Sequence, residues 1–220
     1  MRTVAVISQK GGAGKTTLAL HLAAAAHAAG LITLAIDTDP QATLSRWSGW
    51  RSGEDPEVID CGAPTLLEGK LKRAAELGAD LAVIDTPPHA DAMARQAARL
   101  ADLILVPCRP KAFDLAAIEA TAELVRSARK PGFVVFMAGP PRARLIYQEA
   151  SELVSGAADG LEIAPVALPE RAAFHHSTAR GAVAGEFDPD GKAAGEVAAL
   201  WAWASERLGV AVALEPALSP

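Results

Sequence analysis

Lys10-Gly11-Gly12-Ala13-Gly14-Lys15-Thr16-Thr17 is the stretch that decides the fold. It follows a short apolar run, Val4–Ile7, and opens a helical stretch, Thr16–Ala29. Glycines allow backbone N–H groups to curl around an anion, and the N-terminus of the following helix adds a favourable dipole. The pattern therefore predicts a phosphate-binding loop, in which Lys15 reaches the β- and γ-phosphates and the Thr16 hydroxyl binds Mg²⁺.

The loop departs from the ordinary pattern G-x-x-x-x-G-K-[ST] at its first position. Gln9 stands where that pattern has glycine, and Lys10 supplies an additional cation at the start of the loop. Because of this departure, fewer classes of phosphate-loop protein fit the sequence than would fit a full match to the ordinary pattern.

Length and composition are those of one globular domain. The chain has 220 residues, of which 50% are hydrophobic and 21% are charged, enough for a sizeable core. The net charge of −5 gives no general attraction to nucleic acid or to an anionic membrane, so DNA binding would need a local basic patch. Cys61 and Cys108 lie far apart without C-x-x-C spacing, which predicts buried or idle thiols in a reducing compartment, with a metal or disulfide role as the alternative.

No targeting or membrane-spanning segment is expected. The first residues lead directly into the Val4–Ile7 run, so we expect no signal peptide. No apolar run reaches the roughly 18–20 residues that a spanning helix needs. A soluble cytoplasmic protein is predicted.

Apolar runs alternate with helical patterns along the chain. The predicted strands are Val4–Ile7, Ile32–Ile36, Leu81–Ile84, Leu103–Val106 and Phe133–Met137. The predicted helices are Thr16–Ala29, Pro64–Leu77, Ala90–Leu100, Asp114–Arg129, Arg144–Ser155 and Lys192–Leu208. This order predicts an α/β fold, a single-domain P-loop NTPase with a mostly parallel twisted sheet and helices on both faces. We expect the domain to span residues 1–208 and a tail to span 209–220.

Acidic residues follow two of the predicted strands. Asp37 and Asp39 come after the second strand and Asp85 after the third, at the sheet edge where parallel sheets bind ligands. Asp85 is expected on the Mg²⁺ side of a nucleotide site, although a carboxylate that caps the next helix is the alternative. Asp37 and Asp39 can both face the nucleotide only if the chain turns, which Pro40 favours. One would then hold a metal-bound water and the other the attacking water, and a plain Asx-turn is the alternative.

Three motifs together resemble the ParA family of partition ATPases. They are the stretch from Lys10 to Thr17, Asp37-Thr-Asp39-Pro-Gln41, and Val83-Ile-Asp85-Thr-Pro-Pro88. The family belongs to the deviant-Walker-A class, which also contains MinD. The similarity extends over residues 1–208 and is loose in the last third. We expect no extra N-terminal DNA-binding domain, which makes the chain similar to the small ParF-type members.

The resemblance implies roles for individual residues. Lys10 would cross an ATP-dependent homodimer interface to the partner's phosphates, and Thr17 would contact the α-phosphate. Asp39 would place the attacking water, with Asp37 nearer to Mg²⁺. Lys10, Lys15 and Asp39 are thus the expected catalytic residues, and Thr16, Asp37 and Asp85 the expected metal residues. ATP and Mg²⁺ are the implied cofactors, and hydrolysis would be slow until a ParB-like centromere-binding or cargo adaptor protein stimulates it.

The resemblance also implies that the dimer binds DNA without sequence preference. The candidate basic residues are Arg142, Arg144, Arg171, Arg180 and Lys111. Phosphate contacts of this kind would be salt-sensitive, and each arginine alone could equally be solvated surface. The protein would then segregate DNA and associate with the nucleoid in its ATP state. Positioning of a protein cargo is the alternative, because both uses share one ATPase design.

Two other functions fit the sequence less well. A MinD-like membrane cycle needs a basic amphipathic C-terminal helix, and residues 209–220 contain no Lys or Arg, so no membrane partner is expected. An iron–sulfur carrier would need paired cysteines, and a metabolic synthetase is not expected to combine Lys10 with the Asp37–Gln41 motif.

The adjacent His175 and His176 lack metal-site spacing and are expected at the surface. Trp201 and Trp203 are two apart on a helix, so only one is expected in the core.

Overall fold

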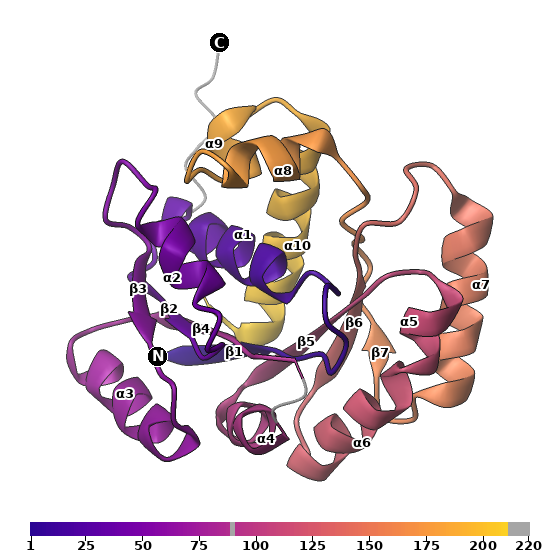
Figure 1. Ribbon diagram of the computed structural model, residues 1–220, viewed down its shortest axis with the longest axis horizontal. Coiled ribbons are helices and arrows are strands. Elements are labelled where there is room, and N and C mark those ends of the chain that lie inside the picture. The colour runs from indigo at the N-terminus through magenta and orange to yellow at the C-terminus, as the bar shows by residue number, and fades with distance from the viewer. Residues whose placement is uncertain (89–90, 211–220) are drawn as a thin grey trace.

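The computed structural model describes residues 1–88 and 91–210, which form one parallel sheet covered by helices (Figure 1). The sheet has seven strands in the order β3-β2-β4-β1-β5-β6-β7. The strands are β1 Arg2–Val6, β2 Thr33–Asp37, β3 Glu57–Asp60, β4 Leu81–Asp85, β5 Leu103–Cys108, β6 Gly132–Phe136 and β7 Glu162–Ile163. Every neighbouring pair of these strands is parallel.

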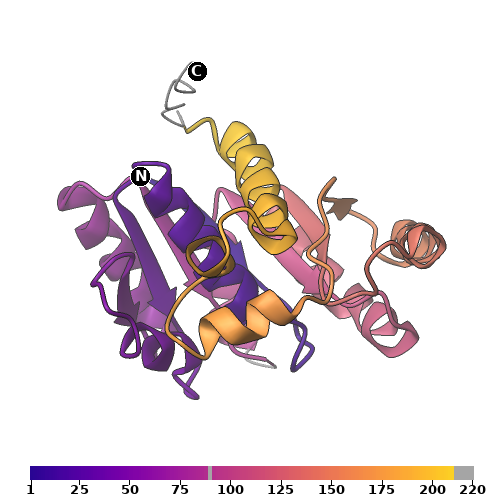
Figure 2. The ribbon, with the colours of Figure 1, turned by 90° about the horizontal axis from the view of Figure 1, so that it is seen from above.

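Helices cover both faces of the sheet. They are α1 Lys15–Ala28, α2 Thr43–Ser48, α3 Pro64–Glu76, α4 Asp91–Leu100, α5 Ala112–Ala116, α6 Ile118–Ala128, α7 Arg144–Ala157, α8 Ala172–Thr178, α9 Ala184–Phe187 and α10 Lys192–Leu208. In Figures 1 and 2, α1 and α10 lie over one face, with α8 and α9 beyond them, while α3, α4 and α6 lie under the other. No helix in the described ranges is long and apolar enough to cross a membrane.

The central strands are apolar on both sides because each side faces a separate layer of helices. Val4 and Val6 belong to the core that includes α1 and α10, whereas Ala5 and Ile7 belong to the core that includes α3, α4 and α6. Alternate side chains of a strand point to opposite faces of a sheet. A continuous apolar run such as Val4–Ile7 is therefore what a doubly covered parallel strand requires.

The strand register brings three loops to one edge of the sheet. β4 lies between β2 and β1, so that Asp85 is level with Asp37 on one side and with Val6 on the other. The loop after β1 and the loops after β2 and β4 are consequently neighbours. Chain segments separated by tens of residues in sequence thus meet at the loop from Lys10 to Thr17.

The predicted fold class is confirmed, and the differences concern short elements. β3, β7, α2, α8 and α9 were not predicted, because elements of two to seven residues carry little periodicity. The predicted helix Asp114–Arg129 was wrong as one piece, since α5 ends at Ala116 and α6 begins at Ile118. Ala90, the expected start of one helix, and residues 211–220 of the expected tail lie outside the described residues.

Several predicted environments of single residues are also confirmed. Cys61 and Cys108 are buried free thiols. Trp201 is buried and Trp203 is half-buried, as their spacing on one helix requires.

Gly132, the first residue of β6, allows tight packing between the sheet and its helices. A Cβ atom there would overlap Val125 Cγ1 and lie 2.8 Å from Leu161 Cδ2. Replacing Gly132 with Ala is therefore expected to lower the free energy of unfolding by about 1–3 kcal/mol, measured by urea denaturation. Gly69→Ala is the matched control: that site on α3 is exposed, with no atom within 4 Å of an added Cβ. It should gain up to about 1 kcal/mol, and equal effects at both sites would contradict this account.

Candidate nucleotide-binding site

The loop from Lys10 to Thr17 connects β1 to α1 and has the backbone conformation of an anion cradle. Gly12 and Gly14 have φ angles of 70° and 100°, which favour glycine because it has no Cβ atom. Gly14 is the N-cap of α1, so the unpaired N–H groups of that helix face the loop. An added Cβ at Gly14 would lie 3.1 Å from Met137 Cε. The loop thus has a curled backbone and is also closely packed against Met137.

Lys15 lies inside this loop rather than at the surface. Its side chain is 7% exposed, and its ammonium donates a hydrogen bond of 3.2 Å to the Lys10 carbonyl oxygen. Burial lowers the pKa of Lys15, while Asp85 and Asp39 act in the opposite direction. A desolvated ammonium held beside a curled backbone is well placed to bind phosphate oxygens.

Thr16 and Asp85 join the loop to the end of β4. The Thr16 hydroxyl donates a hydrogen bond of 2.7 Å to Asp85 Oδ2. Asp85 is 1% exposed, and its Oδ1 is buried with no hydrogen-bond partner among the residues that the structure describes. Burial raises the pKa of Asp85 to about 7, and the carboxylates of Asp37 and Asp39 add to that rise.

This pair fits Mg²⁺. A buried carboxylate oxygen without a partner, beside a threonine hydroxyl, is the kind of hard oxygen donor that Mg²⁺ prefers. No group of three or more His, Cys, Asp or Glu residues in the described ranges could hold a metal by itself. That also suits Mg²⁺, which is usually held by one or two carboxylates together with substrate phosphates rather than by a complete protein cage.

Asp37 is near this pair, but both of its carboxylate oxygens accept hydrogen bonds from other residues of the chain. Its Oδ1 accepts the Asp39 N–H at 3.0 Å, and its Oδ2 accepts the Ser45 N–H at 2.9 Å and the Ser45 hydroxyl at 3.1 Å. Ser45 lies in α2, and its hydroxyl also contacts Asp60 at the end of β3. Asp37 therefore anchors α2 to the sheet edge, a role that its sequence position did not indicate.

Asp39 reaches the same side because the chain turns after β2, as Pro40 predicts. The turn is closed by a hydrogen bond of 2.8 Å from the Ala42 N–H to the Asp39 carbonyl. Asp39 Oδ1 also accepts the Gln41 N–H at 2.9 Å, which is the alternative Asx-turn. Its half-buried carboxylate nevertheless acts electrostatically on both Lys15 and Asp85. Asp39 therefore forms the Asx-turn and also lies close enough to the loop to act on Lys15 and Asp85.

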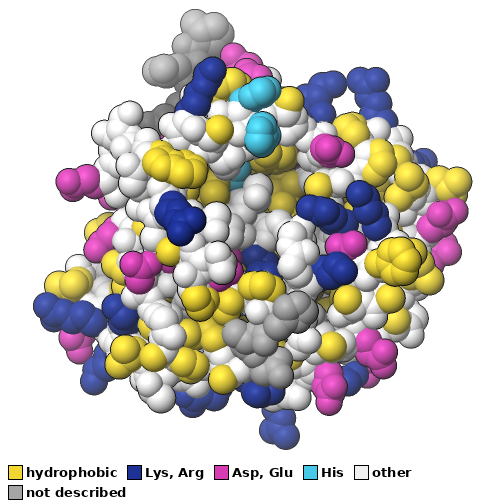
Figure 3. Space-filling model, in the orientation of Figure 1, with side chains coloured by type: hydrophobic (Ala, Val, Ile, Leu, Met, Phe, Trp, Pro, Cys, Tyr) yellow, Lys and Arg dark blue, Asp and Glu magenta, His cyan; other side chains and the backbone are white. Residues whose placement is uncertain are grey.

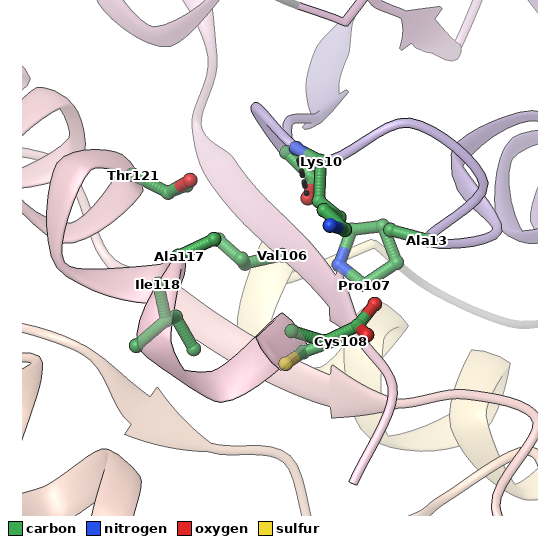
Figure 4. Close-up of a pocket in the computed structure, with 10 residues that line it drawn as sticks. Lys10, Ala13, Val106, Pro107, Cys108, Ala117, Ile118 and Thr121 are labelled. Atoms are coloured by element: carbon green, nitrogen blue, oxygen red, sulfur yellow. Dashed lines mark hydrogen bonds between the residues drawn. The ribbon is translucent and has the colours of Figure 1, made fainter. Parts of the chain in front are cut away.

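Lys10 lies at the outer side of the loop. Its N–H donates to Ser8 Oγ at 3.4 Å, and its exposed side chain extends toward Pro107 at the end of β5 (Figure 4). The small cavity beneath it has a volume of about 10 Å³ and is lined by Asp114 and Thr121 among others. The Lys10 side chain is thus accessible, whereas that of Lys15 is enclosed.

A larger cleft adjoins the loop on the side of α8. It has a volume of about 520 Å³, and its lining includes Gly14, Thr17, Arg109, Met137, Leu168 and Phe174. None of these except Gly14 and Thr17 was expected from the sequence. The segments after β5, β6 and β7 that supply the others contain no glycine-rich or acidic motif. Only their position after consecutive strands of a parallel sheet could have identified them.

A model of the CobQ/CobB/MinD/ParA nucleotide binding domain matches residues 4–183, which is more than half of the chain. The chain belongs to this family. The ParA-family membership predicted from three motifs is confirmed.

Curated relatives support this assignment, and a solved structure shares the fold. Protein ParA of Rhizobium radiobacter is 31% identical over 182 residues, covering 79% of this chain and 81% of that protein. Maintenance of carboxysome distribution protein A of Halothiobacillus neapolitanus is 36% identical over 134 residues, 58% of this chain. The match spans only 60% of that relative's length. A Cyanothece McdA variant solved as its ATP complex has a TM-score of 0.72 at 18% identity, covering 96% of this chain and 97% of its own, which shows the fold.

The arginines expected to contact DNA have different environments in this ParA-family domain. Arg171 is paired with Glu196 through a hydrogen bond of 2.8 Å from Nε to Oε2. Arg180 lies over the Phe187 ring, 5.2 Å from its centroid. Arg142 and Arg144, before and at the start of α7, are exposed. On the face seen in Figure 3, Lys and Arg side chains form separate groups among acidic and hydrophobic ones. A continuous basic patch is not present on that face.

His21 links the loop that ends at Thr17 to α9, and sequence reasoning missed it. Its Nδ1 lies 2.8 Å from the Thr17 carbonyl oxygen, and its Nε2 accepts the Ala184 N–H at 3.1 Å. These contacts assign the proton to Nδ1 of a neutral ring. The ring also packs edge-on against Phe174, which lines the 520 Å³ cleft. Burial lowers the pKa of His21 to about 4.

The lowered pKa makes His21 a source of pH-dependent stability. Between pH 6.5 and pH 4 the unfolded chain takes up a proton at His21 that the folded protein does not, so stability present above pH 6.5 is lost as the pH falls. The raised pKa of Asp85 acts in the opposite direction, since its burial costs stability as the pH rises from 3.8 to about 7. The two effects partly cancel in the wild type, so a variant is needed to separate them.

We expect the free energy of unfolding of the wild type, relative to that of His21→Leu, to fall by about 3 kcal/mol as the pH is lowered from 7 to 4. Both proteins carry Asp85, so its contribution drops out of the comparison. The measurement is the free energy of unfolding in urea at several pH values. A difference that does not change with pH would show that His21 titrates normally in the folded protein.

Proposed function

We propose that this chain is an ATPase that binds ATP with Mg²⁺ and hydrolyses ATP to ADP and phosphate. The observation that carries the proposal is the Thr16–Asp85 pair beside the enclosed Lys15, at the N-terminus of α1. A desolvated cation, a helix N-terminus and a carboxylate with an unpartnered oxygen together match a nucleotide triphosphate and its metal.

Each residue would contribute separately to that reaction. Thr16 and Asp85 would hold Mg²⁺, with Asp37 close by, and the metal would neutralise charge on the β- and γ-phosphates. Lys15 would bind the same phosphates, and Thr17 the α-phosphate. Asp39 would orient the attacking water, because it is half-buried and close enough to act on Lys15 and Asp85. The 520 Å³ cleft beyond Thr17 is large enough for the base and ribose.

ATP would also control association of the protein. Lys10 is exposed on the outer side of the loop, from which it could reach the phosphates of a second copy. A cation supplied by the partner stabilises charge that develops during phosphoryl transfer. We therefore infer an ATP-dependent homodimer that separates after hydrolysis.

We further propose that the ATP dimer binds DNA without sequence preference and cooperates with a ParB-like or cargo adaptor that stimulates hydrolysis. Arg142, Arg144 and Arg180 are the proposed phosphate contacts, with Arg171 less available because of Glu196. The net charge of −5 makes local basic residues necessary for such binding. The ATP form would be associated with the nucleoid in the cytoplasm, and no membrane partner is proposed.

A second cargo class is supported by one of the comparisons. The Halothiobacillus relative, 36% identical, is named for carboxysome distribution. Positioning of a protein assembly is therefore a candidate beside plasmid or chromosome partition. Both would use the same ATP cycle, and the adaptor would select the cargo.

Lys15→Ala tests the nucleotide site directly. Loss of the enclosed ammonium should weaken ATP binding by at least about a hundredfold, because a charge-assisted contact to phosphate disappears. Isothermal titration calorimetry with ATP and Mg²⁺ measures this. The exposed Lys72→Ala on α3 is the control, and ATP affinity in Lys15→Ala equal to that of the control would disprove the phosphate role.

DNA retention by nucleotide state tests the proposed cycle. The wild type should be retained on nonspecific duplex DNA with ATP, and released with ADP or without nucleotide, in a salt-dependent manner. Asp39→Ala should still bind ATP and dimerise but not hydrolyse, so that it stays on DNA. Anionic vesicles run in parallel distinguish a membrane cycle. DNA retention that is equal with ATP, with ADP and without nucleotide would refute the cycle. A normal rate of ATP hydrolysis in Asp39→Ala would show that another residue has the catalytic role.

A further inference from the structure

Arg109 lies against the nucleotide-binding loop although no motif marks it. It follows Cys108, the last residue of β5, and β5 is the direct neighbour of β1 in the sheet. Its Nη2 would lie 3.7 Å from a Cβ atom added to Gly12. The side chain is half-buried and lines the 520 Å³ cleft together with Gly14 and Thr17.

The charge of Arg109 is not paired with any residue that the structure describes. Its Nε is buried and has no hydrogen-bond partner among residues 1–88 and 91–210. Glu170 lines the same cleft but makes no ion pair with it in the described structure. The other arginine of the cleft, Arg171, is satisfied by Glu196. Arg109 therefore differs from Arg171 in having donors available for a ligand.

An unsatisfied, partly desolvated guanidinium is unfavourable unless an anion is supplied from outside. Gly14, the N-cap of α1, and Thr17 in its first turn line the same cleft, so phosphate oxygens are the matching acceptors. Pro107 and Pro110 flank the arginine and restrict the backbone that holds it.

We propose that Arg109 is a third cationic residue of the nucleotide site, which binds the phosphate chain of ATP or ADP in addition to Lys10 and Lys15. This proposal rests on the proposed ATP binding and adds a residue to it. Arg109 donates hydrogen bonds to the β-phosphate side of the nucleotide, and Gly12 allows that approach because a larger side chain would narrow the space between the loop and the guanidinium.

The test uses the full chain and ADP, because ADP binding is separate from ATP-dependent dimerisation. Arg109→Gln should raise the Kd for ADP by about ten- to a hundredfold, as expected for loss of a charge-assisted contact. The Kd for AMP should change much less, because AMP lacks the β-phosphate. Isothermal titration calorimetry gives both affinities, and the exposed Arg73→Gln on α3 is the matched control.

Stability without nucleotide provides an independent measurement. Removing an unpartnered charge should leave the melting temperature of Arg109→Gln equal to or above that of the wild type, whereas loss of a structural contact would lower it. A Kd for ADP within twofold of the wild type, or equal weakening for ADP and AMP, overturns the proposal. If Arg109→Gln does not fold, Arg109→Lys, which loses the guanidinium fork, must weaken ADP binding by more than twofold or the proposal fails. Absence of nucleotide binding in the wild type would instead refute the proposed function.

Discussion

The hydrogen bond between Thr16 and Asp85 is the contact on which the site depends. It joins the first turn of α1 to the end of β4, and it can form because β1 and β4 are adjacent and in register from Arg2–Leu81 to Val6–Asp85. A shift of one residue would turn Asp85 to the other face of the sheet. The doubly buried, apolar strands therefore fix the chemistry as well as the fold, because their register decides which carboxylate meets the loop.

The sequence was sufficient for the parts of the molecule in which a local pattern has a local cause. The glycines of the loop, the alternating apolar runs and the aspartates at strand ends each predict their own placement. Asp37 shows the limit of prediction from a local pattern. Its position after a strand predicts an edge carboxylate, but its hydrogen bonds to Ser45 depend on how α2 packs, and a six-residue helix has no periodicity from which to predict that packing.

Arg109 and His21 were missed for a related reason. Neither belongs to a motif, and each is defined by contacts with residues far away in sequence: Arg109 with the loop at Gly12, His21 with Ala184. Such contacts result from the strand order and from the way α9 returns over α1. Sequence patterns describe single elements, whereas these residues are specified by the arrangement of several elements.

The nucleotide site also carries electrostatic costs that the chain does not remove by itself. Burial lowers the pKa of Lys15 and raises that of Asp85 to about 7, and one nitrogen of Arg109 is buried without a partner in the described part of the chain. Each of these destabilises the protein when the site is isolated from compensating charge. A phosphate chain with its cation supplies opposite charges to all three groups at once. In the proposed ATP cycle, ligand binding and stability of the folded site would therefore be thermodynamically linked, and the same linkage would allow nucleotide state to control which surface the protein presents.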